Sequence, residues 1–525
     1  MIAATLRRIQ IASVLMLGLA TQALAAEPAA EHFDVLEFRV LGNTVLPVAD
    51  VERAVYSYLG PDKTLDDVQG ARAALENAYH AAGYGTVFVD IPEQEIVDGI
   101  VRLHAAEGHI DRVRVSGARY FSNHRILASL PDLEHGQVPE LPALQSQLAD
   151  VNRQSADRGV TPVLSAGRTP GTVDIELRVR DSLPLHGAVA LNDRYTSDTT
   201  HLRSVVDLSY GNLFQSFQSL SFEYQTAPTR TADARVLALT YVAPLQSSSN
   251  LLAVYGVDTN SDVAAVGTLN VLGKGRILGA RFIHTYSGGN LLHNLNFGAD
   301  YKDFAETINL DEGVSDRTPI RYINWSLQYS LTERGARHQT MYNIGVNFGI
   351  RSLVNEESAF KYKRFDAHAD YFYLRGGIDQ QMSLFGGTSL DARLTAQLTE
   401  HPLISNEQFG VGGAETVRGY LESQVLGDLG AAGSLELHGP AWPLWGDRAH
   451  NSITLIGFVD GGVVHVLEAL PQQENWNTLA STGVGFRVSA FGGLQAAFDW
   501  AYPLESEGRV ARGDYRLSFQ VRYGF

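Results

Sequence analysis

The chain contains 525 residues, 45% of them hydrophobic and 19% charged, and its formal net charge is −17 at pH 7. This composition is too apolar and too poor in charge for a disordered chain, and the acidic excess excludes a generally basic protein that neutralises nucleic-acid phosphates. The chain has no cysteine, which excludes disulfide bonds, thiolate metal sites and cysteine nucleophiles.

The first 25 residues have the pattern of a secretory signal peptide. Arg7 and Arg8 supply positive charge, residues 9–19 are apolar, and residues 23–25 form a small-residue cleavage site. The apolar run is shorter than the roughly 20 residues that a membrane-spanning helix needs. We therefore predict cleavage after Ala25 and an exported mature protein without a helical span.

A degenerate repeat follows the signal peptide. Residues 35–43 resemble residues 110–118, and each segment is typical of a strand that ends in a glycine turn. In both copies, two segments of helical periodicity and two further strands come next. One sheet covered by two helices is the natural fold of such a unit. The sequence predicts two soluble α+β domains, at residues 34–108 and 109–182.

Glycines mark the expected ends of the longer helix in each repeat. In the first copy this helix covers residues 66–82 and is followed by Gly83, and in the second it covers residues 142–156, with Gly159 beyond it. Glycine is common just after a helix because it readily adopts a positive φ. We therefore expect both glycines to stop their helices.

Short alternating segments dominate the chain from residue 183 to residue 525. In the last one, apolar side chains with aromatic residues at both ends alternate with polar or small ones. Lipid outside and water inside a barrel require this arrangement. The segments start near residues 185, 203, 217, 234, 250, 275, 292, 319, 338, 362, 387, 433, 452, 481, 493 and 515.

These sixteen segments predict a transmembrane all-β fold, a 16-stranded antiparallel barrel over residues 183–525 that follows the two α+β domains. Closure matters because an open sheet edge in hydrocarbon leaves backbone groups without partners. A soluble sandwich of the same strands is the alternative, and the signal peptide and the aromatic strand ends disfavour it.

Two short motifs lie in the second half of the barrel. The longest expected connection, residues 399–432, holds Val417, Arg418, Gly419 and Tyr420. The thirteenth strand holds Phe458, Asp460 and Gly462. Asp460 must face the lumen, since a carboxylate toward lipid is costly. A guanidinium inside a narrow lumen needs a partner, and Asp460 projects where a returning loop could present Arg418, in a bidentate contact. The alternative is that they form one of many ion pairs in the lumen.

These features resemble the TpsB transporters of two-partner secretion, the ShlB/FhaC/HecB-like hemolysin secretion/activation proteins. Val417 to Tyr420 is similar to the inward-loop signature of the outer-membrane insertase and transporter superfamily, and Phe458 to Gly462 to its paired strand motif. The repeats resemble POTRA domains, the periplasmic modules that precede such barrels. Phe525, after an alternating strand, is similar to the sorting signal of outer-membrane barrels.

The resemblance implies a translocator of the cell outer membrane, not an enzyme, with its POTRA domains in the periplasm. They would receive an unfolded, secreted TpsA-like exoprotein, expected to be β-helical, which then crosses the barrel to the cell surface. The other implied partners are outer-membrane lipid and the barrel assembly machinery, and nucleic acid is not among them. The alternatives are an insertase that assembles other barrels and a small-solute porin, which would not need the repeats.

Val87, Phe88 and Val89 are the candidate docking residues for the exoprotein. They lie beside the longer helix of the first repeat and would form an exposed sheet edge, able to pair with an extended segment by strand addition. An ordinary internal strand is an equally good interpretation.

The family's plug helix is not expected here. Only residues 26–33 separate the cleavage site from the first strand, too few for a helix that traverses a pore. We therefore expect the inward loop to be the main obstruction, and the Arg418–Asp460 pair to anchor it and to be needed for transport. Reversing both charges should then restore the secretion that either single reversal abolishes.

Signatures of catalysis are absent from the sequence. There is no GxSxG, HExxH or GxxxxGK[ST] motif, and the 16 histidines are scattered. We expect no catalytic residue, no cofactor and no metal site.

Overall fold

The computed structural model describes residues 31–525 except 198, 246, 262, 267–268, 312–313, 447–450 and 472, so the expected signal peptide lies outside the described residues. The chain divides into two compact units. Of the described residues, one comprises those up to Arg114 with Pro131–Ser146 and Pro162–Glu176, and the other comprises those in Val115–Leu130, Gln147–Thr161 and Leu177–Phe525. Within the described residues, no helix combines the length and the hydropathy that crossing a membrane requires.

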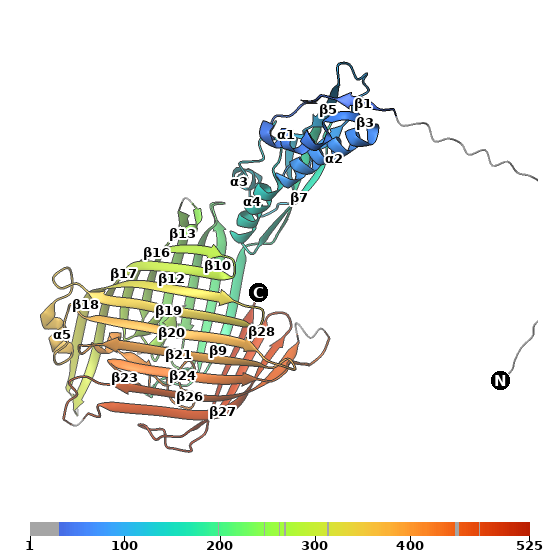
Figure 1. The fold of residues 1–525 in the computed structure, drawn as a ribbon. Helices are drawn as coiled ribbons and strands as arrows, with labels where there is room; N and C mark the ends of the chain where they lie inside the picture. The colour runs from blue at the N-terminus through green and yellow to red at the C-terminus, as the bar shows by residue number, and fades with distance from the viewer. Residues whose placement is uncertain are drawn as a thin grey trace, which may run out of the picture. The chain divides into compact units, whose positions relative to one another are not determined.

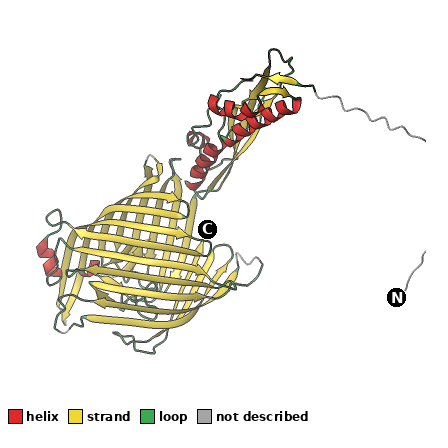
Figure 2. Cartoon of the chain, viewed as in Figure 1, coloured by secondary structure: helices red, strands yellow, loops and turns green. Residues whose placement is uncertain are grey.

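The first repeat has the expected α+β fold (Figures 1 and 2). Its elements are β1 (Phe33–Val35), β2 (Glu37–Leu41), α1 (Val48–Val55), the short 3-10 helix η1 (Tyr56–Tyr58), β3 (Gly60–Lys63), α2 (Leu65–Ala81), β4 (Phe88–Asp90) and β5 (Ile100–Ala106). The main sheet has the order β2-β5-β4, with β2 parallel to β5 and β4 antiparallel to it at the edge. The small β1–β3 sheet is an addition that the sequence pattern did not indicate.

Helix α2 packs on this sheet through the stripe that its periodicity predicts. Its buried residues are Val68, Ala71, Leu75 and Tyr79. Thr64 and Asp67 form a capping box at its start, which satisfies backbone N–H groups that would otherwise lack partners. Gly83 has a φ of +98° and the Tyr84 N–H donates to the Tyr79 carbonyl at 3.0 Å, so the expected glycine stop is confirmed.

The second repeat has the same order of main elements. It consists of β6 (His109–Ser116), α3 (Asn123–Ala128), α4 (Leu141–Arg153), β7 (Arg158–Ala166) and β8 (Thr172–Asp181), with the sheet order β6-β8-β7. The prediction for Gly159 is wrong, because this residue lies inside β7. The side chain of Asn152 accepts the Val160 N–H at 2.7 Å and donates to its carbonyl at 3.1 Å, so the end of α4 holds the start of β7.

A carboxylate holds the turn after the first strand in both repeats. Glu107 accepts the N–H groups of Thr44 and Val45 at 2.8 and 3.2 Å. Asp181 accepts those of Arg119, Tyr120 and Phe121 at 2.9, 2.7 and 3.1 Å. In each case the turn begins just beyond the repeat's glycine, Gly42 or Gly117, which has a positive φ. The sequence comparison found the glycines but missed these carboxylates.

Sixteen strands of the described part form one closed antiparallel barrel, which confirms the predicted fold class and excludes a sandwich. They are β9 (Leu185–Asn192), β10 (Arg203–Leu213), β11 (Gln218–Thr226), β12 (Arg235–Leu245), β13 (Ser247–Thr259), β16 (Gly275–Gly288), β17 (Leu291–Asp311), β18 (Val314–Arg334), β19 (His338–Gly349), β20 (Phe372–Ser383), β21 (Ser389–Thr399), β24 (Leu429–His438), β26 (Ser452–His465), β27 (Trp476–Ala490), β28 (Leu494–Pro503) and β29 (Arg516–Gly524). The two-residue β25 (Trp442–Pro443) extends the pairing on β26, and β29 pairs with β9. The described residues also form the β14–β15 pair (Val263–Val266 and Leu269–Leu272).

The two faces of the barrel wall differ as a bilayer requires. In β12, Leu237 and Leu239 are 42% and 49% exposed, whereas Val236 and Ala238 between and beside them are 0% and 3% exposed. The exposed face is the apolar surface that lipid covers. The inward face of β12 is also apolar and buried, so material inside the barrel must cover it.

The expected strand start near residue 362 is wrong. Helix α5 (Glu357–Lys363) occupies this place, and β20 begins only at Phe372. Phe360 of α5 is 1% exposed because it packs inside the apolar cluster that also holds Tyr322 and Tyr371. Alternation alone could not separate this short helix from a strand.

We call the barrel end at which β9 begins the near end and the opposite end the far end. Because neighbouring strands are antiparallel, the connections 350–371, 400–428 and 466–475 all lie at the far end. The connection 400–428 contains the 3-10 helix η2 (Ser405–Glu407) and the strands β22 (Phe409–Val411) and β23 (Val425–Gly427), which pair with each other.

Candidate functional site

The connection 400–428 packs against the inner face of the barrel wall. Val417 and Tyr420 are 0% and 2% exposed. They belong to a buried apolar cluster with Phe409, Val411 and Val425 of the same connection and with Ala432, Val464 and Leu479 of β24, β26 and β27. The connection is therefore an inward loop, with its own small core against one side of the lumen.

The structure brings Arg418 and Asp460 together. The Nε and Nη2 atoms of Arg418 donate to the two carboxylate oxygens of Asp460 at 2.7 and 2.8 Å, and its backbone N–H donates to the same carboxylate at 3.1 Å. The two residues are 6% and 1% exposed. Two parallel bonds from a guanidinium to a carboxylate fix both distance and orientation. We call this pair the anchor.

The anchor has further members that sequence reasoning missed. Arg418 also donates to Glu436, and to the Ser434 hydroxyl at 3.2 Å. The Ser434 hydroxyl donates to Asp460 at 2.7 Å, and the Arg418 guanidinium lies 3.5 Å from the centroid of the Phe458 ring. The available signal was alternation: Ser434 and Glu436 occupy alternate positions on β24, directly opposite Asp460 and Phe458.

The motif glycines make room for the inward loop. A Cβ atom on Gly462 would lie 2.5 Å from Val411 and 3.2 Å from Val417, so any larger residue would push the loop off the wall. Gly419 has a φ of +92°, which disfavours every residue with a side chain. The Tyr420 hydroxyl accepts the Glu505 N–H at 3.2 Å and lies 2.8 Å from the Glu505 carbonyl oxygen.

Glu415 extends the contacts of the inward loop to two separate parts of the wall. Its carboxylate pairs with Arg194, which follows β9, and with Arg393 on β21, at 3.3 Å for the latter. A cavity of about 330 Å³ lies beside this residue, and Arg393 and Asp379 line it. Glu415 is 57% exposed, so solvent weakens these pairs.

The predicted docking residues lie at a sheet edge that is already occupied. Phe88 is 57% exposed, whereas Val87 and Val89 are buried. Glu76 of α2 accepts the Val89 N–H at 3.1 Å, and Arg72 donates to the Val89 carbonyl at 3.2 Å. An incoming strand would have to displace these side chains before it could pair with β4.

The last residue joins the two ends of the barrel sheet. The Phe525 N–H donates to the Gly187 carbonyl at 2.9 Å, and the Gly187 N–H donates back to Phe525 at 3.1 Å. Gly187 belongs to β9, and the Phe525 side chain is 69% exposed. Phe525 thus continues the β9–β29 pairing at the near end.

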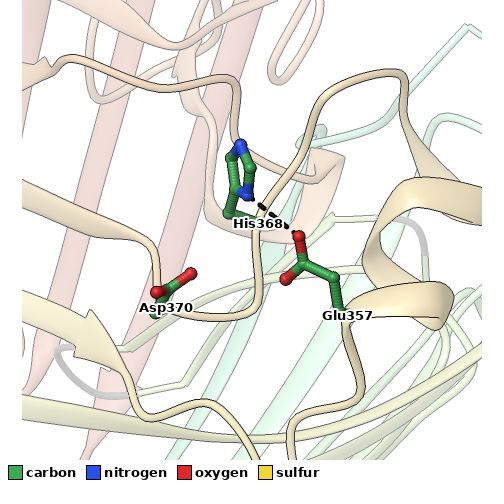
Figure 3. A group of neighbouring side chains, drawn as sticks. All are labelled: Glu357, His368 and Asp370. Atoms are coloured by element: carbon green, nitrogen blue, oxygen red, sulfur yellow. Dashed lines mark hydrogen bonds and ion pairs between the residues drawn. The ribbon is translucent and has the colours of Figure 1, made fainter.

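One group of described residues brings potential metal ligands together: Glu357, His368 and Asp370 at the far end (Figure 3). Arg351 lies 3.3 Å from Glu357 and 2.9 Å from Asp370, and Lys361 lies 3.3 Å from Glu357. Two cations therefore already balance the two carboxylates. The arrangement fits an ion-pair cluster that orders the connection 350–371 better than it fits a metal site.

Comparison with known proteins gives two family matches. Residues 171–488 match the family described as haemolysin secretion/activation protein ShlB/FhaC/HecB. Residues 33–108 match the family described as POTRA domain, ShlB-type.

Similar individual proteins are transporters of the outer membrane. The outer membrane transporter CdiB of Dickeya dadantii is 22% identical over 457 residues, which cover 82% of this chain and 76% of that protein. CdiB of Escherichia coli O6:K15:H31 is 22% identical over 516 residues, 94% of this chain and 82% of that protein. The solved structure of CdiB from Escherichia coli matches with a TM-score of 0.62 at 19% identity over 96% of this chain and 92% of that one. BamA from Haemophilus ducreyi without POTRA domains 1–3 matches with a TM-score of 0.57 at 14% identity, over 94% of this chain and 100% of that one, which shows a shared fold.

Proposed function

The chain belongs to the haemolysin secretion/activation family of ShlB, FhaC and HecB, and we propose that it is the translocator of a two-partner secretion system. It is an outer-membrane transporter whose POTRA domains lie in the periplasm. The proposed cargo is one unfolded exoprotein, which docks on the POTRA domains, crosses the barrel and leaves at the far end.

The observation that carries this proposal is the inward loop anchored inside the lumen. The loop takes up space that a water-filled diffusion channel leaves open, and a channel wide enough for a polypeptide must stay sealed until its cargo arrives. Arg418 holds the loop through bonds to Asp460, Glu436 and Ser434 that converge on one side chain, so they can form and break together. These bonds therefore suit a loop that has two positions.

The test is removal of the chain from cells that produce it together with its exoprotein. We expect secretion of that one exoprotein to stop while the other outer-membrane proteins keep their normal amounts. A general loss of outer-membrane proteins would instead favour the alternative, an assembly factor. The likeness to BamA shows only the fold and does not favour that alternative.

The role of the anchor is tested by charge reversal. Arg418→Glu and Asp460→Arg should each abolish secretion, because each leaves two like charges facing each other in a buried site. The double reversal should restore secretion only in part, since the reversed acid at position 418 would still face Glu436. Normal secretion by both single variants would show that the anchor is not needed.

We further propose that the exoprotein docks at the edge strand β4. Its backbone would replace the bonds that Arg72 and Glu76 make to Val89, and its side chains would contact Phe88. A photoreactive residue at position 88 should crosslink to the exoprotein in the periplasm. The control position is Tyr56, which is 75% exposed in the same repeat and lies outside the β2-β5-β4 sheet. Equal crosslinking at both positions would contradict docking at β4.

A further inference from the structure

A second buried ion pair lies at the far end, outside the family motifs. The two Nη atoms of Arg364 donate to the two carboxylate oxygens of Asp428 at 2.5 and 2.6 Å. The Asp428 side chain is 0% exposed and that of Arg364 is 16% exposed. A pair this deeply buried is costly to break, because each partner would be left as an uncompensated charge.

This pair joins three far-end connections to one another. Arg364 comes from the connection 350–371, and Asp428 closes the inward loop. The carboxylate of Asp428 also accepts the backbone N–H groups of Leu403 and Leu467, both at 2.8 Å. Arg364 in turn donates to the Leu467 carbonyl at 2.9 Å. We call these four residues the joint.

The segments on the two sides of the joint pack against the inner face of the barrel wall. Phe360 of the connection 350–371 and Leu403 and Ile404 of the inward loop are each 1% exposed. They share one apolar cluster with inward-facing residues of six strands, Val236, Ala238, Tyr255, Val257, Ile277, Phe304, Ile320, Tyr322 and Tyr373. Both segments therefore occupy part of the space inside the barrel that a polypeptide would have to cross.

We propose that the joint is the latch of a far-end gate whose two leaves are the connection 350–371 and the residues 400–408 of the inward loop. The latch rests on the proposed function, because a gate of this size is needed only for a polypeptide. It differs from the anchor in what it holds. The anchor fixes the inward loop to the wall, whereas the joint fixes one connection to another and must open before the leaves can separate.

The first test measures ion conduction by the purified full-length chain in planar lipid bilayers, without any exoprotein. Arg364→Ala should raise the fraction of time spent conducting at least about tenfold, because the unpaired Asp428 carboxylate would destabilise the closed arrangement. The matched control is Arg321→Ala. Arg321 pairs with Asp303 at 3.1 Å between the wall strands β18 and β17, outside both leaves, so its removal should leave conduction unchanged. Equal conduction by the two variants would overturn the latch.

A second variant separates a latch from general damage to the fold. The chain has no cysteine, so Arg364→Cys and Asp428→Cys together provide the only thiols. The double variant loses the ion pair and the bonds of Asp428 to Leu403 and Leu467, so it should also conduct more than the wild type. It should return to the wild-type level when a short reducible linker bridges the two thiols, and conduct again after reduction. Conduction that persists in the bridged protein would overturn the proposal. This test remains valid if Arg364→Ala fails to form a barrel.

The same double variant in cells distinguishes the latch from the proposed function. The bridged form should block secretion of the exoprotein until a reductant is added. If the linker controls conduction but the wild-type chain secretes no exoprotein, the latch stands and the proposed function fails. If the wild type secretes and the bridged form secretes equally well, the latch fails and the proposed function stands.

Discussion

The anchor and the joint use the same chemistry in two different settings. In both, a buried guanidinium binds a buried aspartate through two bonds. In the anchor, Asp460 and Glu436 are fixed on adjacent wall strands by the sheet register. In the joint, two of the bonds to Asp428 come from backbone N–H groups of separate connections. The wall residues of the anchor are therefore in position whether or not the loop is bound. The joint forms only when all its connections are in place.

This difference teaches how one loop can be both held and released. A preformed wall site can bind the inward loop again when the loop returns, because strand pairing and not the loop holds Asp460 and Glu436 side by side. A site assembled from loops loses all its bonds together when one segment moves. The joint is accordingly suited to switching, and the anchor to positioning.

The largest expected effect is that loss of Arg418 and loss of Arg364 accelerate hydrogen exchange in different segments. Arg418→Ala should cost about 3–5 kcal/mol in the docking of the inward loop, since it leaves Asp460 buried and unpaired. Hydrogen exchange of residues 409–427 should then accelerate more than about a hundredfold, with little change in residues 350–371. Arg364→Ala should accelerate residues 350–371 instead. Mass spectrometry of exchanged peptides from the full chain measures both, and identical patterns in the two variants would break the comparison.

The next effect concerns the close approach of the inward loop to the wall at Gly462. Gly462→Ala should displace the inward loop at a cost of about 1–3 kcal/mol, because the added Cβ would overlap Val411. The adjacent Gly461 is a matched control, since a Cβ placed there meets no atom within 4 Å. Thermal unfolding of the barrel should be nearly equal in both variants, while exchange in residues 409–427 should rise only for Gly462→Ala. Equal exchange in the two would show that the loop does not need this close approach.

A smaller effect is expected at Glu415, which joins the inward loop to two separate parts of the wall. Glu415→Gln removes the charge that pairs with Arg194 and Arg393, but the residue is half exposed. The change should cost below about 1 kcal/mol and alter exchange of the loop less than about fivefold. The difference from wild type should also shrink in 1 M salt, because exposed pairs are screened. An effect as large as that of Arg418→Ala would place Glu415 in the anchor itself.

The smallest effect concerns acid. The hydrogen bond and charge of Arg351 lower the pKa of Asp370 below its ordinary value of 3.8. The pair therefore stabilises the connection 350–371 fully above that value and loses its contribution as pH falls through the lowered pKa. Exchange in residues 350–371 should rise slightly below pH 4, and Arg351→Ala should remove this dependence. A rise at higher pH would point to other groups.

Periodic parts of the chain were predictable from the sequence. Alternation indicated the barrel, and most expected strand starts lie close to the observed ones, because one face of each strand must meet lipid whatever its neighbours are. The glycine at the end of α2 was predictable for a local reason, its positive φ. Gly159 was not, because the Asn152 side chain binds the backbone of Val160 and so holds the start of β7 there. Helix α5 was not, because Phe360 packs against residues of distant strands.

The partners of the known motifs were only partly predictable. Arg418 and Asp460 could be proposed as a pair because a charge inside a barrel needs compensation. Glu436 could have been added by reading alternate positions of β24. Arg364 and Asp428 carry no such signal, since each lies in an irregular connection and their contact depends on how three connections meet.

By itself the sequence determined the two repeats and the barrel, because solvent and lipid impose regular patterns on residues that are near one another in the chain. It indicated the inward loop only through the resemblance of Val417 to Tyr420 to a known motif. The tertiary structure alone decided what fills the lumen, which backbone groups at β4 are occupied and where Arg364 finds its carboxylate. These depend on side chains from distant segments converging in one buried place, where each charge must find a partner and no periodic pattern records which one.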